Sequence, residues 1–148
     1  MSKTLLYKLF RIGRIPKKLR SALKSEEIVV SDEGIGGWFI TRNLKAPGKR
    51  YIHRKEGFTG CLVITQKRIL CYTYWKRQIN ISVQDPKISS LYTELLDPNT
   101  LAISFQCSLF HKNWEGVIEF RFKTEKAQNF YDVLIEKGLQ SGHARDNK

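Results

Sequence analysis

The clearest hydrophobic pattern in the chain lies between residues 60 and 75. Two apolar runs, rich in β-branched and aromatic residues, flank one short polar segment at residues 65–68. The runs are too short for confident helices, so the pattern predicts two strands joined by a tight turn. Apolar residues occupy both the odd and the even positions of each run, whose side chains would face opposite sides of a sheet. This predicts a hairpin that is buried on much of both faces and has other strands on either side of it in the sheet.

The rest of the chain predicts a mainly β domain around this hairpin. Apolar and polar residues alternate cleanly at 101–109 and again at 118–123, which is typical of half-buried strands. The segment 45–57 is polar and cationic with a Pro47-Gly48 turn, and we expect it to be a loop. The remaining strands are expected at residues 28–30, 35–44, 77–83 and 88–96, with a turn or bulge at 31–34.

Two helical segments are predicted before the sheet. Residues 3–14 form a basic amphipathic helix in which the apolar side chains share one arc. That arc holds Leu5, Leu6, Leu9, Phe10 and Ile12, and the opposite arc holds Lys3, Lys8, Arg11 and Arg14. Gly13 and Pro16 end this helix, and Pro16 suits the first turn of a second helix over residues 17–27. In that second helix Leu19, Ala22 and Leu23 are expected to face inward.

A third helix is predicted at the end of the domain. Thr124 is a good N-cap, Glu125 favours the first turn, and Gly138 follows the last helical residue, Lys137. We expect the apolar stripe of this helix to close one open end of the sheet. The stripe consists of Ala127, Phe130, Tyr131, Leu134 and Ile135. The expected organisation is therefore a helix at 1–15, one domain at 16–139 and a polar, disordered tail at 140–148.

Charge is the informative part of the composition. The 148 residues include 26 Lys and Arg against 14 Asp and Glu, which gives a net charge of +12. Eight basic residues and no acid lie in residues 1–24, and six basic residues and no acid lie in residues 42–55. Because the excess is confined to these two stretches, it points to an anionic partner, either a membrane surface or a nucleic acid.

Three phrases of the sequence resemble a known fold family. Residues 62–70, LVITQKRIL, are similar to a hairpin of bacterial pleckstrin-homology-like and GRAM-like domains. Residues 41–51 and 110–116 resemble a bacterial group with the same expected architecture, and the resemblance spans about residues 16–137. It implies a bent two-sheet barrel of about seven antiparallel strands closed by a C-terminal helix. In this family the loop after the first long strand binds phosphoinositides in some members.

The sequence shows no constellation for catalysis. His53, His111 and His143 lack metal-ligand spacing, and no nucleophile or phosphate-binding motif is present. We therefore expect a protein that is not an enzyme, with no catalytic residue, metal, cofactor or small-molecule substrate. The three cysteines, Cys61, Cys71 and Cys107, lie in apolar strand-like runs. They are expected to be reduced core residues of a cytoplasmic protein, with a Cys61–Cys71 bridge as the alternative.

The leading hypothesis is peripheral binding to anionic lipid, at the inner face of the plasma membrane. No stretch approaches the ~20 apolar residues of a membrane span, so attachment would use the surface. The predicted inserting residues are Leu5, Leu9 and Phe10. The predicted anion-binding residues are Lys3, Lys8, Arg11, Arg14, Arg42, Lys45, Lys49, Arg50, Arg54 and Lys55.

Four other interpretations remain beside it. The first helix can pack on its own domain, or the domain can bind a protein partner or a second copy of itself. Nucleic acid is a further possibility, because Tyr51, Tyr72, Tyr74 and Trp75 lie near cations, although core packing explains these aromatics better. A cavity for a small apolar ligand needs an open barrel interior. The last helix argues against such a cavity because it should fill the mouth.

Overall fold

The structure of the chain, a computed structural model, describes residues 3–145, and their secondary structure is mainly β. Within this range the α-helices are α1 (Leu5–Phe10), α2 (Lys17–Ser25) and α3 (Ala127–Lys137). Two 3₁₀ helices span Pro86–Ser90 and Cys107–Leu109. The strands are β1 (Ile28–Ala46), β2 (Lys49–Thr65), β3 (Arg68–Thr73), β4 (Lys76–Ser82), β5 (Tyr92–Asp97), β6 (Thr100–Gln106), β7 (Glu115–Lys123) and β8 (Gln140–Ser141).

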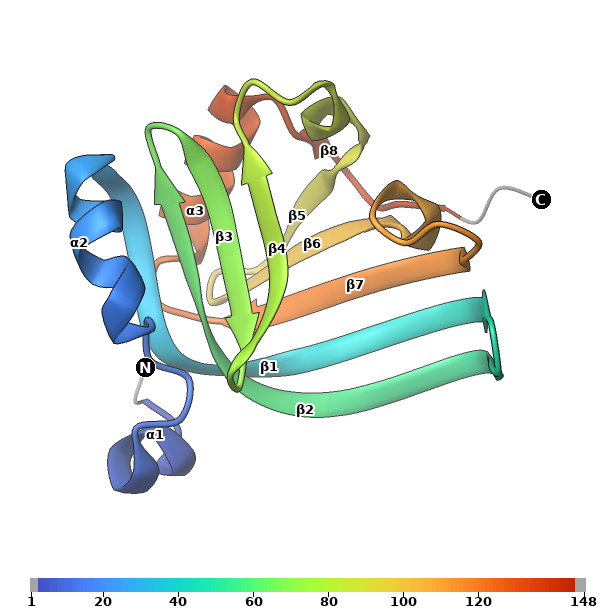
Figure 1. Cartoon of the computed structure of the whole chain (residues 1–148), viewed down its shortest axis with the longest axis horizontal. Coiled ribbons are helices and arrows are strands. Elements are labelled where there is room, and N and C mark those ends of the chain that lie inside the picture. The colour runs from blue at the N-terminus through green and yellow to red at the C-terminus, as the bar shows by residue number, and fades with distance from the viewer. Residues whose placement is uncertain (1–2, 146–148) are drawn as a thin grey trace.

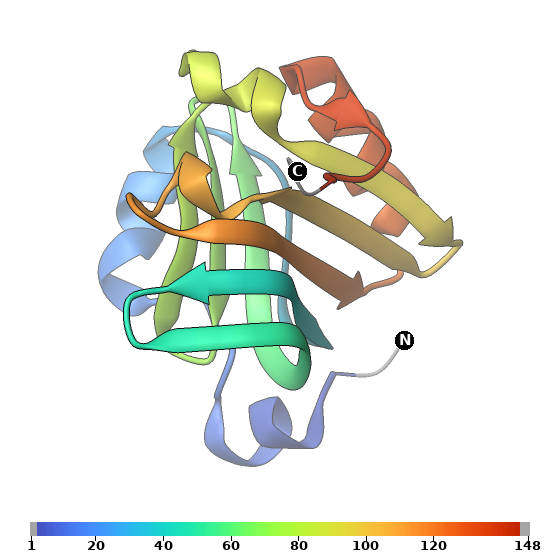
Figure 2. The same cartoon turned by 90° about the vertical axis from the view of Figure 1, so that its right-hand side faces the viewer.

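All eight strands belong to one sheet, in the order β4-β3-β2-β1-β7-β6-β5-β8. Neighbouring strands are antiparallel except β5 and β8, which are parallel, so the sheet is mixed. Figures 1 and 2 show that it curls into a half-barrel. The prediction of two sheets is therefore wrong. β1 and β2 are long enough to run through both halves, and β1 pairs with β7 only from Gly37 onward, so the bend falls within continuous strands.

The predicted central hairpin is confirmed as β2 and β3, with β1 and β4 on either side. Its inner face joins the main hydrophobic core, and its outer face is covered by α2, where Leu23 is fully buried. Leu19 packs against the same outer cluster, whereas Ala22 is exposed, contrary to expectation. Burial on both faces explains why apolar residues fill both parities of this part of the sequence.

The three cysteines are free and buried, as predicted. Cys61 lies opposite Tyr72 in the β2–β3 register, while Cys71 lies opposite Leu62. Side chains alternate between the two faces of a strand, so the two thiols point to opposite faces of the sheet and do not form the alternative bridge. Burial raises the pKa of Cys61 to about 12, and it also raises the pKa of Cys71.

Residues 49–57 are part of a long strand, and the prediction of a loop at 45–57 is wrong apart from its Pro47-Gly48 turn. The second half of β1 and the first half of β2 pair continuously from Gly37 with Phe58 to Ala46 with Lys49. We call this projecting hairpin the arm; it forms the extended end of the sheet in Figure 1. Its β2 half is mostly exposed, so no apolar alternation marks it in the sequence.

Side-chain alternation in the arm is interrupted at Asn43, which has a φ of 52°. The β1–β7 register shifts between Arg42 and Lys45 at the same point. Phe39 and Thr41 face the concave side of the sheet before the irregularity, and Leu44 faces it afterwards. A bulge of this kind re-aims the side chains that follow it, and here it adds Leu44 to the concave face.

The predicted end of the last helix is confirmed: α3 ends at Lys137 and is followed by Gly138 in a left-handed conformation. Its predicted start is wrong, because the helix begins at Ala127 with Lys126 as its N-cap, so Thr124 and Glu125 precede it; the Thr124 hydroxyl accepts from the Lys126 amide at 3.1 Å in the turn before the helix. Ala127, Phe130 and Leu134 are completely buried in the main core, whereas Ile135 is 37% exposed. The helix packs against β5, β6 and β1, at one end of the curled sheet. An expected strand at 88–96 instead begins as the 3₁₀ helix Pro86–Ser90 and continues as β5.

Residues 140–145 are ordered, so the expected disorder of the polar tail is wrong for them; residues 146–148 lie outside the described residues. β8 pairs with β5, and the Ala144 amide donates to Ser104 Oγ at 2.9 Å. This segment covers the outer face of β6, which explains why Ala102 and Ser104 are as buried as the apolar residues between which they alternate.

A buried carboxylate lies beneath the same segment. Glu119 is fully buried between Arg42 and Arg121, at 2.6 Å and 2.5 Å, and His143 Nε2 lies 3.3 Å from it. Burial raises the pKa of Glu119, but the hydrogen bonds and charges of the two guanidinium groups lower it by more. The pKa of Glu119 therefore lies below its ordinary value of 4.5. Glu119 is thus a charged structural residue whose partners come from β1, from β7 and from the segment after β8.

Candidate functional site

Helix α1 is held on the sheet by its polar face. The Thr4 amide donates to the Gly34 carbonyl at 3.0 Å, and the hydroxyl of Thr59 on β2 donates to Thr4 Oγ1 at 3.1 Å. The Tyr7 ring covers Gly34, where a Cβ would lie 2.3 Å from the ring, and its hydroxyl is 3.1 Å from Glu33 Oε1. Gly34 has a φ of +67°, so the bulge predicted at 31–34 provides both the conformation and the space that Tyr7 requires.

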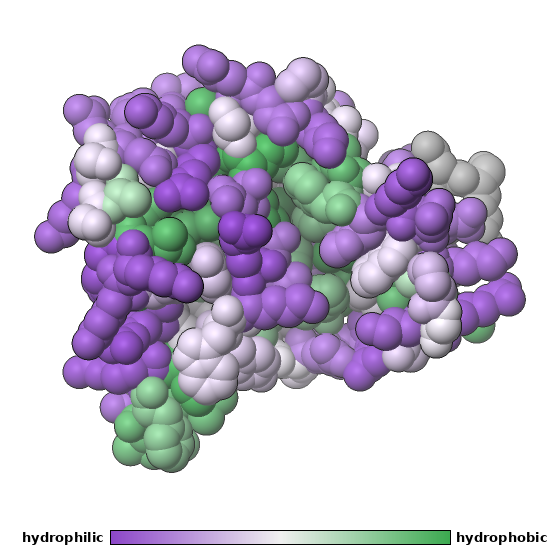
Figure 3. Space-filling model, viewed as in Figure 1, coloured by the Kyte–Doolittle hydropathy of each residue, from purple (hydrophilic) through white to green (hydrophobic). Residues whose placement is uncertain are grey.

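The apolar side chains of α1 consequently point away from the protein. Leu5, Leu9 and Phe10 are 68%, 63% and 67% exposed, and Leu6 is 38% exposed. The helix is shorter than the predicted 3–14, since it ends at Phe10 and Arg11 adopts a left-handed conformation. Figure 3 shows this apolar group as an isolated projection at the lower edge of the molecule. Packing on the protein's own core does not explain the amphipathic pattern of this segment.

The cations predicted around α1 divide into two groups. Lys3 forms an ion pair with Asp32, and its Nζ donates to the Glu33 carbonyl at 2.5 Å. Its charge is therefore largely neutralised by a carboxylate of the protein itself. Lys8 and Arg11 are exposed beside the apolar face, and Arg14 is half-buried. Within residues 3–145 no carboxylate pairs with Lys8, Arg11 or Arg14, and the charges of Lys8 and Arg11 lie on or directly after α1, beside Leu9 and Phe10.

The predicted cations of the arm are less uniform than their sequence suggests. Arg42 is held by buried Glu119, so we omit it from any anion-binding surface. Arg54 pairs with Glu56 at 2.5 Å and lies over the Tyr51 ring at 4.8 Å. Lys55 lies over the Trp38 ring at 4.4 Å. Within the described chain the three others, Lys45, Lys49 and Arg50, form no ion pair; all are exposed.

The two basic stretches do not form one surface. Helix α1 is attached at Thr59, and Lys49 lies ten residues away along the same strand, which corresponds to about 30 Å at ~3.3 Å per residue. Figure 1 shows α1 at one end of the molecule and the β1–β2 turn at the other. The structure therefore brings Lys8 and Arg11 together with the apolar residues of α1, and it separates them from Lys45, Lys49 and Arg50.

A second candidate site opens on the concave side of the half-barrel, away from α3. We call it the open-end groove; it has a volume of about 680 Å³. Its floor includes Phe39, Thr41, Phe58 and Ile118, and its rim includes Lys49, Arg54, Trp75, Lys76, Arg77 and Trp114. Figure 3 shows apolar surface in the hollow between β4 and β7, bordered by polar side chains. No residue of α3 lines the groove, so the last helix does not fill this mouth.

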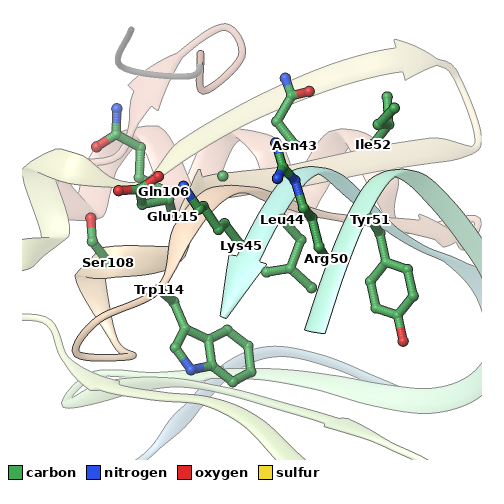
Figure 4. A pocket seen from close by; sticks show the side chains of 11 residues that line it. Asn43, Leu44, Lys45, Arg50, Tyr51, Ile52, Gln106, Ser108, Trp114 and Glu115 are labelled. Carbon is green, nitrogen blue, oxygen red and sulfur yellow. The ribbon is translucent and has the colours of Figure 1, made fainter. Parts of the chain in front are cut away.

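The outer side of the arm carries a more polar recess of about 520 Å³. Figure 4 shows its lining side chains, which come from β1, β2, β6, the 3₁₀ helix Cys107–Leu109, the loop before β7 and the start of β7. Lys45 and Arg50 contribute positive charge, and Glu115, which pairs with Lys45 in the β1–β7 register, contributes negative charge. Leu44, Tyr51 and Trp114 line both this recess and the open-end groove, so the two sites are neighbours.

Sequence reasoning missed several residues of the groove. Trp75 is 74% exposed and Tyr74 is 40% exposed, because β3 ends at Thr73 and the chain turns there. The expectation that these aromatics pack in the core is wrong for Tyr74 and Trp75. Tyr74 donates its hydroxyl to the Gly57 carbonyl at 2.9 Å, so the turn lies against the bend of β2. Lys76 and Arg77 fall outside both charge clusters of the sequence, and nothing there signals that they face the arm.

Comparisons with known proteins assign no relative. No family model matches the chain, and no curated protein matches it at a significant level. Within residues 3–145, no helix combines the length and the apolar character that crossing a bilayer requires.

Proposed function

We propose that this protein is a non-enzymatic, pleckstrin-homology-like module that binds the surface of anionic membranes through α1. One observation carries the proposal: Leu5, Leu9 and Phe10 are about two-thirds exposed although the helix that bears them is fixed to the sheet. Isolated apolar side chains on a protein surface are common, but a projecting group of this kind, bordered by Lys8 and Arg11, fits an interfacial helix.

The fold supports this class without defining it. A curled, mainly antiparallel sheet with a C-terminal helix at one end agrees with the order of elements that the resemblance implies. In the proposed interpretation, the single sheet is a variant of the bent barrel in which β1 and β2 pass through both halves. Fold class by itself says little about ligands, so the membrane proposal depends on α1 and its surroundings.

The energetics favour reversible attachment. Complete burial of a Leu or Phe side chain contributes roughly 1.5–3 kcal/mol, so three side chains that are about two-thirds exposed would contribute about 3–6 kcal/mol. Each cation near an acidic lipid surface adds about 1 kcal/mol, and Lys8 and Arg11 are placed to do so. Trp75 lies at the turn that contacts Gly57, close to the attachment point of α1 at Thr59, and an indole suits the headgroup layer.

This arrangement makes the cations of α1, rather than those of the arm, the main electrostatic contribution. Lys49 and Arg50 lie about 30 Å along β2 from the attachment of α1, and Lys45 of β1 is paired with Arg50; this separation is several Debye lengths at physiological salt. The proposed location of the protein is the cytoplasmic side of an acidic membrane.

The experiment is co-sedimentation of the whole chain with vesicles. It compares neutral phosphatidylcholine with vesicles in which about a third of the lipid is phosphatidylserine, at about 0.1 M and about 0.5 M salt. The informative variant is Leu5→Ser/Leu9→Ser/Phe10→Ser, and the matched control is Ile52→Ser, because Ile52 is 82% exposed on the arm. We expect salt-sensitive binding to acidic vesicles that the triple variant loses and the control retains.

A protein partner is the second candidate, because the same exposed face can bind a second copy of the chain. Sedimentation velocity of the wild type and the triple variant distinguishes the two. A dimer that the triple variant abolishes, together with equal binding to acidic and neutral vesicles, favours self-association. Equal vesicle binding without a dimer would contradict both proposals.

A further inference from the structure

The open-end groove differs in character from the proposed membrane surface. Its floor lies on three adjacent strands: Thr41 of β1 is paired with Arg54 of β2 and with Ile118 of β7. Phe39 and Phe58 continue this floor toward the bend, where both contact Phe120 edge-to-face. The floor is thus mostly apolar and rigidly held by strand pairing, which is the usual construction of a small-molecule site.

One polar atom on this floor is left without a partner. Thr41 is 6% exposed, and its Oγ1 has no hydrogen bond among the described residues. Buried hydroxyl groups are normally paired, because leaving one unpaired is destabilising. Thr41 lines the groove, and because its Oγ1 is itself buried, the side chain must rotate before an oxygen atom of a bound molecule can supply the missing hydrogen bond.

The rim of the groove is strongly cationic. Lys49 and Arg54 approach from the arm, and Lys76 and Arg77 approach from the start of β4. Glu56 is the one carboxylate in the lining, and it is already paired with Arg54. His111 adds no charge at neutral pH, because burial and then the charge of Lys76 lower the pKa of this imidazole below 6.5. The rim therefore suits an anion.

Aromatic side chains complete the walls beside these cations. Trp114 stacks on His111 with ring centroids 4.2 Å apart, and Trp75 projects from the β3–β4 turn. The volume of about 680 Å³ lies within the range of roughly 300–1,000 Å³ that is usual for small-ligand sites. An apolar floor with aromatic walls matches an alkyl chain, and the rim matches a charged head.

We propose that the open-end groove binds a single-chain anionic amphiphile, with its alkyl chain over Phe39 and Phe58 and its anionic head between the cations of the arm and those of β4. A carboxylate or a phosphate ester head has the required charge and oxygen atoms. Thr41, once its side chain has rotated toward the groove, donates its hydroxyl to the ligand where the chain meets the head. This ligand binds from solution, so the inference does not depend on membrane attachment through α1.

The test is isothermal titration calorimetry of the whole protein with four probes. Decanoate and decyl phosphate carry the two candidate heads, decyl glucoside carries a neutral head, and inorganic phosphate lacks the chain. We expect one equivalent of decanoate and one equivalent of decyl phosphate to bind, and decyl glucoside and inorganic phosphate to bind at least about tenfold more weakly. Whichever of decanoate and decyl phosphate binds with the higher affinity identifies the head group that the site prefers. No saturable binding of either anion, or equal affinity for inorganic phosphate, overturns the proposal.

Variants connect the binding to the groove. Lys76→Glu/Arg77→Glu should weaken decanoate binding at least about tenfold, whereas Lys24→Glu on the exposed end of α2 should not. Thr41→Val should weaken binding several-fold while its thermal midpoint stays equal to or above that of the wild type, because the variant removes an unpaired buried hydroxyl. Unchanged affinity in both groove variants overturns the assignment.

The two proposals fail separately. The Leu5→Ser/Leu9→Ser/Phe10→Ser variant should bind decanoate with wild-type affinity, since no residue of α1 lines the groove. Loss of decanoate binding in that variant would contradict an independent groove site.

Discussion

The carboxylate of Glu33 is one of the groups that hold α1 in place, and its contribution is open to a direct test. Glu33 Oε2 accepts from the Ile15 amide at 2.7 Å, and Oε1 lies 3.1 Å from the Tyr7 hydroxyl. Arg20 of α2 forms an ion pair with Glu33 at 3.1 Å. A single side chain of β1 thus connects α1, the turn before α2 and α2 itself. Substitution of Glu33 by Ala removes these links without altering the main core.

The magnitude follows from what each partner loses. Ile15 is buried, so its amide would be left unpaired at a cost of roughly 1–3 kcal/mol. The Tyr7 hydroxyl loses a bond worth about 0.5–1.5 kcal/mol. The Arg20 side chain is 45% exposed, so its ion pair contributes only about 0.2–1 kcal/mol. Because neighbouring effects do not add fully, we expect Glu33→Ala to lower the free energy of unfolding by about 2–4 kcal/mol.

The assay is urea unfolding at pH 7, combined with hydrogen exchange of the Ile15 amide. Glu136→Ala is the matched control on the exposed face of α3, and it should change stability by less than about 0.5 kcal/mol. The reasoning is refuted if Glu33→Ala is as stable as this control, or if the Ile15 amide stays protected in it.

The pH dependence of Glu33 provides a second readout. Burial raises the pKa of Glu33, but the hydrogen bonds from Ile15 and Tyr7 and the charge and hydrogen bond of Arg20 lower it by more. The pKa of Glu33 therefore lies below its ordinary value of 4.5. A carboxyl group with a lowered pKa stabilises the folded state above its unfolded-state pKa, and that stabilisation is lost as the pH falls through the folded-state pKa. The stability difference between wild type and Glu33→Gln should therefore shrink as the pH falls below about 4.5. A difference that is constant down to acid unfolding would contradict this.

Two further predictions concern the core. Phe130→Ala should lower the free energy of unfolding by about 3–5 kcal/mol, because Phe130 is fully buried, whereas Ile135→Ala at a 37% exposed position should cost less than about 1 kcal/mol in the same urea titration. The three buried thiols should react with iodoacetamide at pH 8 at least about tenfold more slowly in the folded protein than in guanidinium, as followed by mass spectrometry. Equal rates in the two states would show that the thiols are accessible.

Local pattern was sufficient for elements that carry their own hydrophobic signal. The β2–β3 hairpin has apolar residues on both faces, and α3 has a clear stripe that Gly138 follows, so the hairpin and the end of α3 were predictable, whereas Thr124 did not mark the start of the helix. Residues 49–57 lack such a signal because much of this half of the arm is exposed. Pairing with β1 makes them a strand, and that pairing is imposed by the strand on the other side of the hairpin turn rather than by their own composition.

The candidate sites show the same limit. Periodicity alone places Leu5, Leu9 and Phe10 of α1 on one arc, but it does not decide whether that arc faces the core or the solvent. The open-end groove was not predicted, because its rim combines residues from β2, from the start of β4 and from the loop before β7. An apolar run such as residues 69–75 also does not reveal where its strand ends, so the exposure of Trp75 could not be inferred. Such sites depend on long-range strand pairing.

The measurement that tests the central claim most directly is the binding of the whole chain to acidic vesicles at low salt, with and without the apolar face of α1. The account predicts that wild type and Ile52→Ser bind equally and that Leu5→Ser/Leu9→Ser/Phe10→Ser does not bind. Undiminished binding by the triple variant would contradict the claim and would move the membrane contact to the cations of the arm.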